Sequence, residues 1–365
     1  MAVSSRFVIV GGGWRAEFFL RAARAMPEVV TCVGVTSRQA TRRNELSRSY
    51  GVEVPASVAE VLERPVEFVV LASSRESMPD LLEEITSHGV PVLVETPPGL
   101  DIAGLRRSWR ASQSGRAQVA EQYRFQPHHA ARLAVLNDGV IGERHQAWVS
   151  VAHGYHAVSL LYEYLDLTRD DWPEISVSAH RMSAPVVRGP DRRGPPGQEE
   201  QVTSERVVAI ITIGDKAGIY DFDPQQYFSE IRSQHVAVRG ERGELHNDDF
   251  TYLPAGTAWR AQRAHLVRVE GGQYGDLGPL GLEEIRFGDK AVFAKRPGLG
   301  PLTDEEIAVA ECLIRMADYA RGGPEFYSVH RACCDRFVEM AVGRSLESQQ
   351  TVVCRPTDWL AGTTT

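Results

Sequence analysis

A glycine-rich stretch near the start of the chain has the residue types and spacing of a phosphate-binding turn. In the stretch VIVGGGWRA, the three positions of a G-x-G-x-x-G/A pattern are Gly11, Gly13 and Ala16. The first glycine permits a tight turn, the second lets a pyrophosphate approach the backbone, and a small third residue lets a helix pack closely on a strand. The N–H groups of the following helix attract anions. The stretch predicts a dinucleotide site that includes Trp14 and Arg15; a plain structural turn is the alternative.

The residues that would bind the adenosine ribose distinguish between two cofactors. They are expected about 20 residues after the third motif position, where the sequence reads Thr36-Ser37-Arg38 and the next carboxylate is Glu45. A carboxylate would accept a hydrogen bond from the free 2′-hydroxyl of NAD, whereas Ser37 and Arg38 can bind the 2′-phosphate of NADP. We therefore favour NADP over NAD, the alternative being that Arg38 is a solvated loop residue.

The elements needed to position this turn are indicated by an alternation of strands and helices up to residue 122. Continuous apolar runs, typical of strands covered on both faces, occur at residues 7–10, 32–36, 68–72, 90–94 and 118–120, and amphipathic stretches separate them at residues 17–25, 58–62, 79–87 and 102–111. Strict alternation indicates βαβ units and a doubly wound parallel sheet. Residues 1–122 are expected to form a Rossmann dinucleotide-binding domain, with Ser73, just after the third strand, in its site.

The pattern changes after Pro127, and residues 123–365 are expected to form an α+β domain with a mainly antiparallel sheet. Helices are predicted at residues 128–136 and 157–165, strands at residues 146–152, 175–180, 206–213, 217–222, 231–239 and 290–294, and closing helices near 302–340. Residues 185–201 are rich in proline, glycine and charge. They are interpreted as a surface excursion in preference to a mobile loop near the site.

Composition excludes several classes of protein. The chain has 365 residues, of which 24% are charged and 43% hydrophobic, as in an ordinary globular protein of two domains. Its net charge of −8 argues against nucleic acid or an anionic membrane surface as the main partner. No apolar run reaches the ~18–20 residues that cross a bilayer, and the N-terminus lacks a signal-peptide layout. The five cysteines are scattered without a C-x-x-C pair, so reduced thiols, a cytoplasmic location and no structural zinc are expected.

Five motifs in chain order resemble those of the Gfo/Idh/MocA oxidoreductases, the family of glucose–fructose oxidoreductase and inositol dehydrogenase. They are the glycine-rich turn, VLVETPP (similar to a strand ending in Glu-Lys-Pro), EQYRFQP (similar to Asn-x-Arg-Phe-x-Pro at the domain junction), DGVIGE and VRGERGE. The resemblance implies a nicotinamide cofactor, a sugar-like or polyol substrate and a homodimer or homotetramer. It also implies that Glu95, Thr96 and Pro97 shape the loop beside the nicotinamide, with Glu95 acting structurally.

The junction motif supplies two further candidates. Gln122 is expected to face substrate hydroxyls or the nicotinamide ribose. Arg124 is assigned to the substrate site, where it could bind a phosphate or pair with Glu95, and bracing the domain junction is the alternative.

This sequence departs from the family pattern at two catalytic positions. The family uses the lysine of Glu-Lys-Pro and an Asp-x-x-x-His pair; here the lysine position is Thr96 and the aspartate position is Ala152, whereas His156 matches the histidine. Two of three expected polar groups are absent, which makes a more specialised reaction plausible, such as reduction of a keto-sugar or an imine.

The remaining candidates for proton transfer lie at the predicted start of a helix. A histidine can move a proton near neutral pH, and the helix dipole at an N-terminus disfavours imidazolium, so His156 is expected to act as a neutral base or proton donor. Tyr155 is expected to assist, and His153 could converge on the same pocket. The alternative for each is a capping or core role.

Three residues farther along are candidate substrate contacts, because the resemblance implies that one face of the second sheet lines the pocket. They are Tyr227, Arg232 and His235. Without a register, the sequence cannot assign their side chains to that face. No metal is expected. The leading hypothesis is an NAD(P)-dependent oxidoreductase that moves a hydride between the nicotinamide and a sugar, glycoside, polyol or keto-sugar. An imine or keto-group reductase and a catalytically silent dinucleotide sensor or scaffold are the alternatives.

Overall fold

The N-terminal third of the protein is built on a parallel sheet, as the alternating pattern predicts. The computed structural model describes residues 4–167, 173–257, 259–272 and 280–361. The strand order is β2-β1-β3-β4-β5 and every pairing is parallel. The strands are β1 (Ser5–Val10), β2 (Val30–Val35), β3 (Phe68–Leu71), β4 (Val92–Val94) and β5 (Ala117–Val119). Apolar residues fill β3 and β4 because helices cover both faces of the sheet.

Five helices accompany this sheet: α1 (Trp14–Ala25), α2 (Ala40–Tyr50), α3 (Val58–Leu62), α4 (Met78–Ser87) and α5 (Ile102–Ser114). Four of them were predicted. The apolar pattern did not reveal α2 because only Leu46 of that helix is buried, so its sequence is polar on nearly every side.

The second domain contains a mixed sheet of eleven strands in the order β15-β14-β13-β12-β11-β10-β6-β9-β8-β7-β16. All pairings are antiparallel except that of β6 with β9, which confirms the expected α+β fold. The strands are β6 (Arg144–Ser150), β7 (Ile175–Val187), β8 (Gln201–Ile213), β9 (Lys216–Phe222), β10 (His235–Gly240), β11 (Gly243–His246), β12 (Asp249–Tyr252), β13 (Gln262–Gly271), β14 (Gly281–Phe287), β15 (Lys290–Ala294) and β16 (Val352–Cys354).

Several of these strands were missed or misplaced by the sequence. The apolar pattern did not indicate β11–β14 or β16, and it gave only the first part of β7. The strand predicted at residues 231–239 begins at His235 instead, after an irregular segment. Burial in β13 is confined to Leu266 and Gly271 among exposed and half-buried positions, and a strand with so few buried side chains carries little apolar signal.

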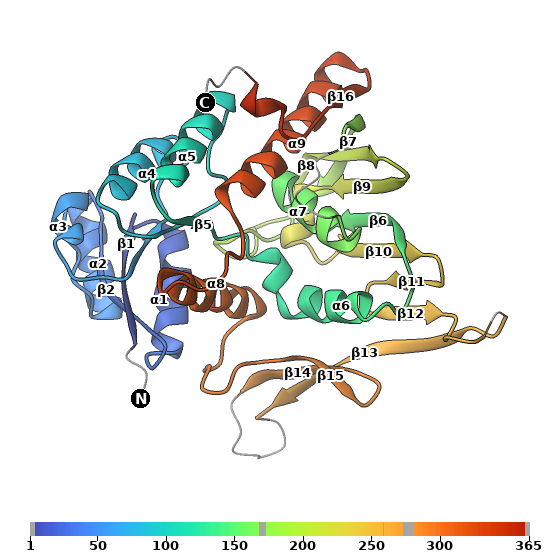
Figure 1. Ribbon diagram of the computed structural model, residues 1–365, viewed down its shortest axis with the longest axis horizontal. Helices are drawn as coiled ribbons and strands as arrows, with labels where there is room; N and C mark the ends of the chain where they lie inside the picture. The colour runs from blue at the N-terminus through green and yellow to red at the C-terminus, as the bar shows by residue number, and fades with distance from the viewer. Residues whose placement is uncertain (1–3, 168–172, 258, 273–279, 362–365) are drawn as a thin grey trace.

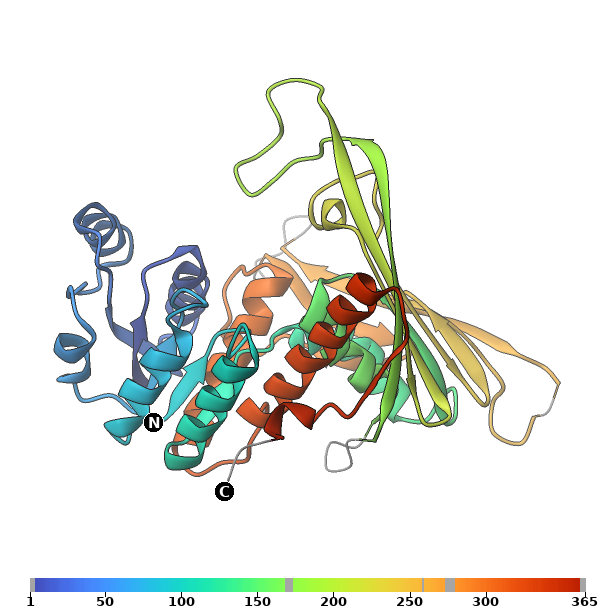
Figure 2. The same ribbon diagram turned by 90° about the horizontal axis from the view of Figure 1, so that it is seen from above.

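Helices lie on one face of the large sheet and leave the other open (Figure 2). The covered face contacts α6 (Pro127–Asn137) and α7 (Gly154–Tyr164), and its residues Ala147, Val149 and Val236 are completely buried. Because side chains alternate along a strand, the intervening residues Trp148 and His235 point to the open face. We call these the helix-covered face and the open face.

The closing helices connect the two domains. In Figure 1, α8 (Asp304–Ala320) lies beside α1, and α9 (Val329–Ser348) lies between α5 and the large sheet. The backbone N–H groups of Phe326 and Tyr327 donate to the Gln118 side chain at distances of 2.9 and 2.8 Å, and Val119 donates to the Tyr327 carbonyl. The C-terminal part of the chain therefore completes the Rossmann domain, an arrangement not included in the predicted division at residue 122.

Among the described residues, no helix is both long and apolar enough to span a membrane. The same residues contain no cluster of three or more histidine, cysteine or acidic side chains arranged to hold a metal ion.

Candidate active site

The glycine-rich turn forms a cradle between β1 and α1. Gly11 has φ of +118°, and a Cβ atom there would lie 2.2 Å from the carbonyl oxygen of Ala72, so only glycine fits without strain. Its N–H group donates to the Thr36 hydroxyl at 2.9 Å, which fixes the turn against the end of β2. A Cβ on Gly13 would meet nothing within 4 Å. The backbone there is open to a ligand, as a pyrophosphate requires.

A cavity of about 730 Å³ opens from this cradle. Seven of the predicted cofactor candidates line it, namely Gly11, Gly13, Trp14, Arg15, Ser37, Arg38 and Ser73. Ala16, the third position of the glycine motif, lies buried behind the turn. The described lining residues include arginines but no aspartate or glutamate. The space and the chemistry of the lining both fit a dinucleotide.

The arginines of this cavity differ in whether their charge is already paired with a carboxylate. Arg15 is held by Glu95 at 2.5 Å and by Glu305 at 2.7 Å, and Arg42 pairs with Glu17. The exposed Arg38 side chain makes no hydrogen bond or ion pair within the described part of the chain. Arg38 is therefore the arginine whose charge is available to a 2′-phosphate.

Glu95 and its neighbours form a rigid corner at the end of β4. The Glu95 carboxylate bonds Arg15 and also accepts the backbone N–H of Thr96 at 3.1 Å. Pro97 follows a cis peptide bond. The Thr96 side chain lies close enough to the Tyr155 phenol to oppose the rise of its pKa, so the corner adjoins the start of α7.

The histidine predicted to transfer a proton is paired with a buried carboxylate. The Nδ1 atom of His156 lies 2.6 Å from a carboxylate oxygen of Glu121, which follows β5. His156 is 5% exposed and Glu121 2%. Burial raises the pKa of Glu121 to about 8 and lowers the pKa of His156 to about 3. At neutral pH the pair thus shares one proton and carries no net charge.

The carboxylate partner of His156 is Glu121 and not a residue at the start of α7. Ala152, at the position where the family pattern has aspartate, is completely buried and apolar. The partner of His156 comes instead from the domain junction, 35 residues earlier in the chain. No sequence pattern indicated a role for Glu121. The signal that could have revealed it is an acidic residue in a buried position directly after a strand.

Aromatic rings surround His156. Its ring centroid lies 4.3 Å from Tyr155, 4.5 Å from Tyr123 and 5.1 Å from His153. His153 is the N-cap residue of α7, and its Nδ1 lies 2.5 Å from the hydroxyl of Tyr227. The structure therefore brings His153, Tyr155, His156 and Tyr227 into one cluster, to which the sequence analysis had not assigned Tyr123.

Burial sets the ionisation of this cluster. It lowers the pKa of His153 to about 3; the neighbouring His156, which disfavours a second imidazolium beside it, and the charges of nearby arginines act in the same direction. Burial also raises the pKa of the Tyr155 and Tyr227 phenols. Near neutral pH these groups are uncharged hydrogen-bonding partners.

The two junction candidates have different surroundings. Gln122 is buried, and its amide oxygen has no hydrogen-bond partner among the described residues. Such an unpaired buried acceptor suits a ligand hydroxyl or N–H group. Arg124 pairs with Glu163 of α7 at 2.9 Å, which is the bracing arrangement considered above.

Arg232 and His235 belong to another part of the molecule. Arg232 pairs with Asp223, and His235 packs on Trp148. Both line a separate cavity of about 580 Å³ on the open face, whereas His156 extends from α7 on the helix-covered face. The register of β10 directs His235 to the open face, and Arg232, in the irregular segment before β10, lines the same cavity. Neither residue lies with the His156 cluster, which corrects their assignment to one pocket with it.

The segment 185–201 also requires a correction. It is exposed almost throughout, as expected of a surface excursion, but it does not lie apart from the site. It forms the end of the β7–β8 hairpin, and its Arg192 guanidinium lies 3.8 Å from the ring centroid of Trp14.

A parallel dinucleotide-binding sheet followed by a domain with a large mixed sheet, with a histidine–carboxylate pair at their junction, defines a class of two-domain nicotinamide-dependent oxidoreductase. Residues 5–123 match the Gfo/Idh/MocA model, described as "Oxidoreductase family, NAD-binding Rossmann fold". This match covers the N-terminal domain and agrees with the resemblance carried by the motifs. No curated protein matches the sequence significantly.

Solved structures share the fold over the whole chain. Levoglucosan dehydrogenase, in complex with NADH and levoglucosan, is 14% identical, with a TM-score of 0.68 over 96% of this chain and 99% of that one. A myo-inositol dehydrogenase from Corynebacterium glutamicum is 16% identical, with a TM-score of 0.63 over 97% and 100%. An oxidoreductase from Agrobacterium radiobacter, in complex with NAD+, L-tartaric acid and magnesium, is 14% identical, with a TM-score of 0.64 over 96% and 98%. Identities this low establish the fold alone.

Proposed function

We propose that this protein is an NADP-preferring dehydrogenase that oxidises a carbinol, or reduces the corresponding carbonyl, of a sugar-like substrate. The nicotinamide, when bound, accepts or supplies the hydride. The observation that carries the proposal is the buried Glu121–His156 pair, which can exchange one proton with a substrate oxygen where the two domains meet.

The pair has two forms that differ by one proton. When Glu121 is ionised, its carboxylate accepts the Nδ1–H of His156, and Nε2 has a free lone pair that can take a hydroxyl proton. As that proton arrives at Nε2, the Nδ1 proton moves to Glu121. In the resulting form the carboxyl O–H donates to Nδ1 and Nε2 carries the proton, which is the form that protonates a carbonyl oxygen in the reverse direction. The imidazole stays neutral in both forms, as its burial requires.

The neighbouring groups position a substrate for this exchange. Among the described residues, the Nε2 atom of His156 makes no hydrogen bond, so it is available to a ligand. Tyr155 and Tyr227 offer hydroxyls within the same cluster, and the unpaired amide oxygen of Gln122 is a further acceptor. A polyhydroxylated molecule suits such a set of polar groups. Dehydrogenases that share the fold, among them a levoglucosan dehydrogenase and a myo-inositol dehydrogenase, support the proposal of a sugar-like substrate.

The preference for NADP rests on the lining of the nucleotide cavity. Ser37 and the unpaired Arg38 line it, and the described lining residues include no carboxylate to bond a free 2′-hydroxyl. Fluorescence titration with NADPH and NADH tests this preference. We expect tighter binding of NADPH and a loss of about tenfold on Arg38→Ala. Arg48→Ala, on the exposed side of α2, is the matched control and should bind NADPH as the wild type does.

Two other results would change the proposal. A preference for NADH would overturn the role of Arg38 but not the oxidoreductase activity. Binding of neither nucleotide would overturn the proposed function.

The open face of the large sheet supports a homo-oligomer. Trp148 and Ile210 are exposed there, 36% and 51% respectively, and helices leave that face uncovered (Figure 2). Burying these side chains against a second copy would remove apolar area from water. Light scattering after size-exclusion chromatography should give at least twice the monomer mass, and Ile210→Glu should lower it. A monomer at micromolar concentration would contradict this interface.

A further inference from the structure

The end of the β7–β8 hairpin presents one arginine toward the N-terminal domain. Figure 2 shows the hairpin leaving the large sheet and its connecting loop curling back over the molecule. At the tip, Asp191 and Gly194 exchange two backbone hydrogen bonds of 3.0 and 2.9 Å, and the Asp191 carboxylate accepts the backbone N–H of Arg193 at 2.7 Å. This closed turn fixes the backbone on both sides of Arg192.

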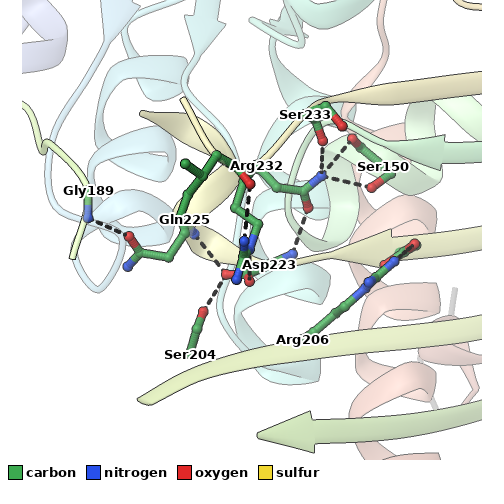
Figure 3. A network of polar contacts seen from close by, with 11 residues as sticks. Ser150, Gly189, Ser204, Arg206, Asp223, Gln225, Arg232 and Ser233 are labelled. Atoms are coloured by element: carbon green, nitrogen blue, oxygen red, sulfur yellow. Dashed lines mark hydrogen bonds and ion pairs between the residues drawn. The ribbon is translucent and has the colours of Figure 1, made fainter. Parts of the chain in front are cut away.

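The base of the loop is anchored to the second domain (Figure 3). The Gly189 N–H donates to the Gln225 side chain at 3.1 Å, and the Gln225 N–H donates to Asp223 at 2.9 Å. Ser204, on β8, donates to the same carboxylate. A Cβ on Gly189 would lie 2.6 Å from Ser229, so the loop backbone is packed closely at this point. The loop direction is therefore set by a network of contacts.

The two arginines of the turn have different partners. Arg193 pairs with Asp191 at 2.9 Å, and its side chain is 88% exposed. Arg192 stacks on Trp14, with its guanidinium 3.8 Å from the ring centroid, and has no ion pair within the described residues. Because Trp14 lines the nucleotide cavity, Arg192 brings an uncompensated positive charge to the edge of the active site.

A second such charge comes from the opposite domain. Arg75 follows Ser73 and Ser74, which line the nucleotide cavity after β3, and it too has no ion pair among the described residues. Its field reaches His153, Tyr155 and His156, and that of Arg192 reaches His153 and Tyr227. The geometry agrees for Arg192, because its loop is bonded at Gly189 to Gln225, two residues before Tyr227, whose hydroxyl contacts His153.

A third arginine near the cluster is already engaged. Arg336 pairs with Glu339 and donates to the carbonyl of Leu100 at 3.0 Å. Arg75 and Arg192 are both exposed, so water solvates their charges in the free protein and an anionic ligand can replace that water. Arg336 has its carboxylate, whereas Arg75 and Arg192 would be compensated by a ligand.

We propose that Arg192 and Arg75 bind an anionic group of the substrate, so that the protein acts on sugar acids or sugar phosphates in preference to neutral polyols. This inference rests on the proposed function. A carboxylate and a phosphate share the chemistry that two guanidinium groups recognise, in which planar N–H donors face anionic oxygens. The hairpin then determines substrate specificity from the second domain, while the glycine turn holds the nucleotide.

Calorimetric titration of the NADPH-loaded protein with D-glucose, D-glucuronate and D-glucose 6-phosphate tests the inference. We expect one of the two anions to bind at least about tenfold more tightly than glucose, and the preferred anion distinguishes a carboxylate site from a phosphate site. Arg192→Ala and Arg75→Ala should each weaken that anion about tenfold without changing NADPH affinity. Arg193→Ala, one residue along the same turn, should bind it as the wild type does.

Three results would overturn the inference. In the first, glucose binds as tightly as both anions, or neither anion binds. In the second, Arg192→Ala weakens NADPH and leaves anion affinity unchanged, which would assign Arg192 to the cofactor. In the third, Arg193→Ala weakens the anion as much as Arg192→Ala does, which would indicate a general charge effect. Failure of the proposed function gives a different result, because the protein would then not bind NADPH at all. That result is known before any anion is titrated.

Discussion

Replacing Glu121 with glutamine tests the proton exchange most directly. Oxidation of a carbinol requires the ionised carboxylate, and burial raises the pKa of Glu121 to about 8. One pH unit below that pKa, about a tenth of the molecules are in the active form. For the wild type, kcat/KM for oxidation should therefore rise about tenfold between pH 7 and a plateau above pH 9. Reduction requires the protonated pair, so its rate should fall over the same interval.

Glu121→Gln removes the proton acceptor and keeps the shape. A carboxamide can still bond Nδ1 of His156 but cannot take its proton, and His156 alone, with its pKa near 3, is a weak base. Because general acid–base groups contribute about 10²–10⁴-fold, we expect oxidation to slow by at least about 10²-fold. The pH dependence between 7 and 9 should disappear.

The assay is the initial rate of NADP reduction from pH 6 to pH 10, with NADPH affinity and thermal unfolding measured for each variant. Glu339→Gln is the matched control, because its carboxylate lies near Gly154 at the start of the same helix without bonding His156. It should retain the pH profile and most of the rate. If Glu121→Gln keeps the wild-type rate and profile, the proton passes through another group and the proposed mechanism is wrong.

Further predictions concern the histidine and the helix that holds it. His156→Ala should slow turnover by about 10²–10⁴-fold and leave NADPH affinity unchanged; equal rates would support a binding-only protein. Gly154 has φ of +44°, and a Cβ there would lie 1.8 Å from the Glu339 carboxylate. Gly154→Ala should therefore destabilise the protein by about 1–3 kcal/mol in urea unfolding. Gly343→Ala, in open space within α9, should be neutral or stabilise by up to about 1 kcal/mol; equal losses at both sites would contradict the steric argument.

The Rossmann domain could be predicted from the sequence because its signals are local. A strand covered on both faces is continuously apolar over a few residues, as in Phe68–Leu71. The glycine positions follow from a single turn, and Gly11 has the left-handed backbone that its motif position implies. His156 was proposed from its match to the histidine of the family pattern and from its place near a predicted helix start, where the structure also has it.

The second sheet shows where local patterns fail. The face to which His235 points depends on register, since a shift of one residue along a strand reverses the direction of every side chain. The sequence alone was compatible with either face of the sheet. In the structure His235 pairs with Ser150, next to the buried Val149, and this register directs His235 to the open face.

The sequence by itself predicted a dinucleotide-binding fold and proposed residues for binding a nucleotide and transferring a proton. The tertiary structure decided their partners. Glu121 meets His156 across 35 residues, and Arg192 reaches Trp14 from the other domain. These pairs depend on how two sheets, a hairpin and a domain junction are arranged in space. The hydrophobic periodicity of a sequence does not predict these contacts, because an electrostatic partner is selected by proximity in the fold and not by spacing along the chain.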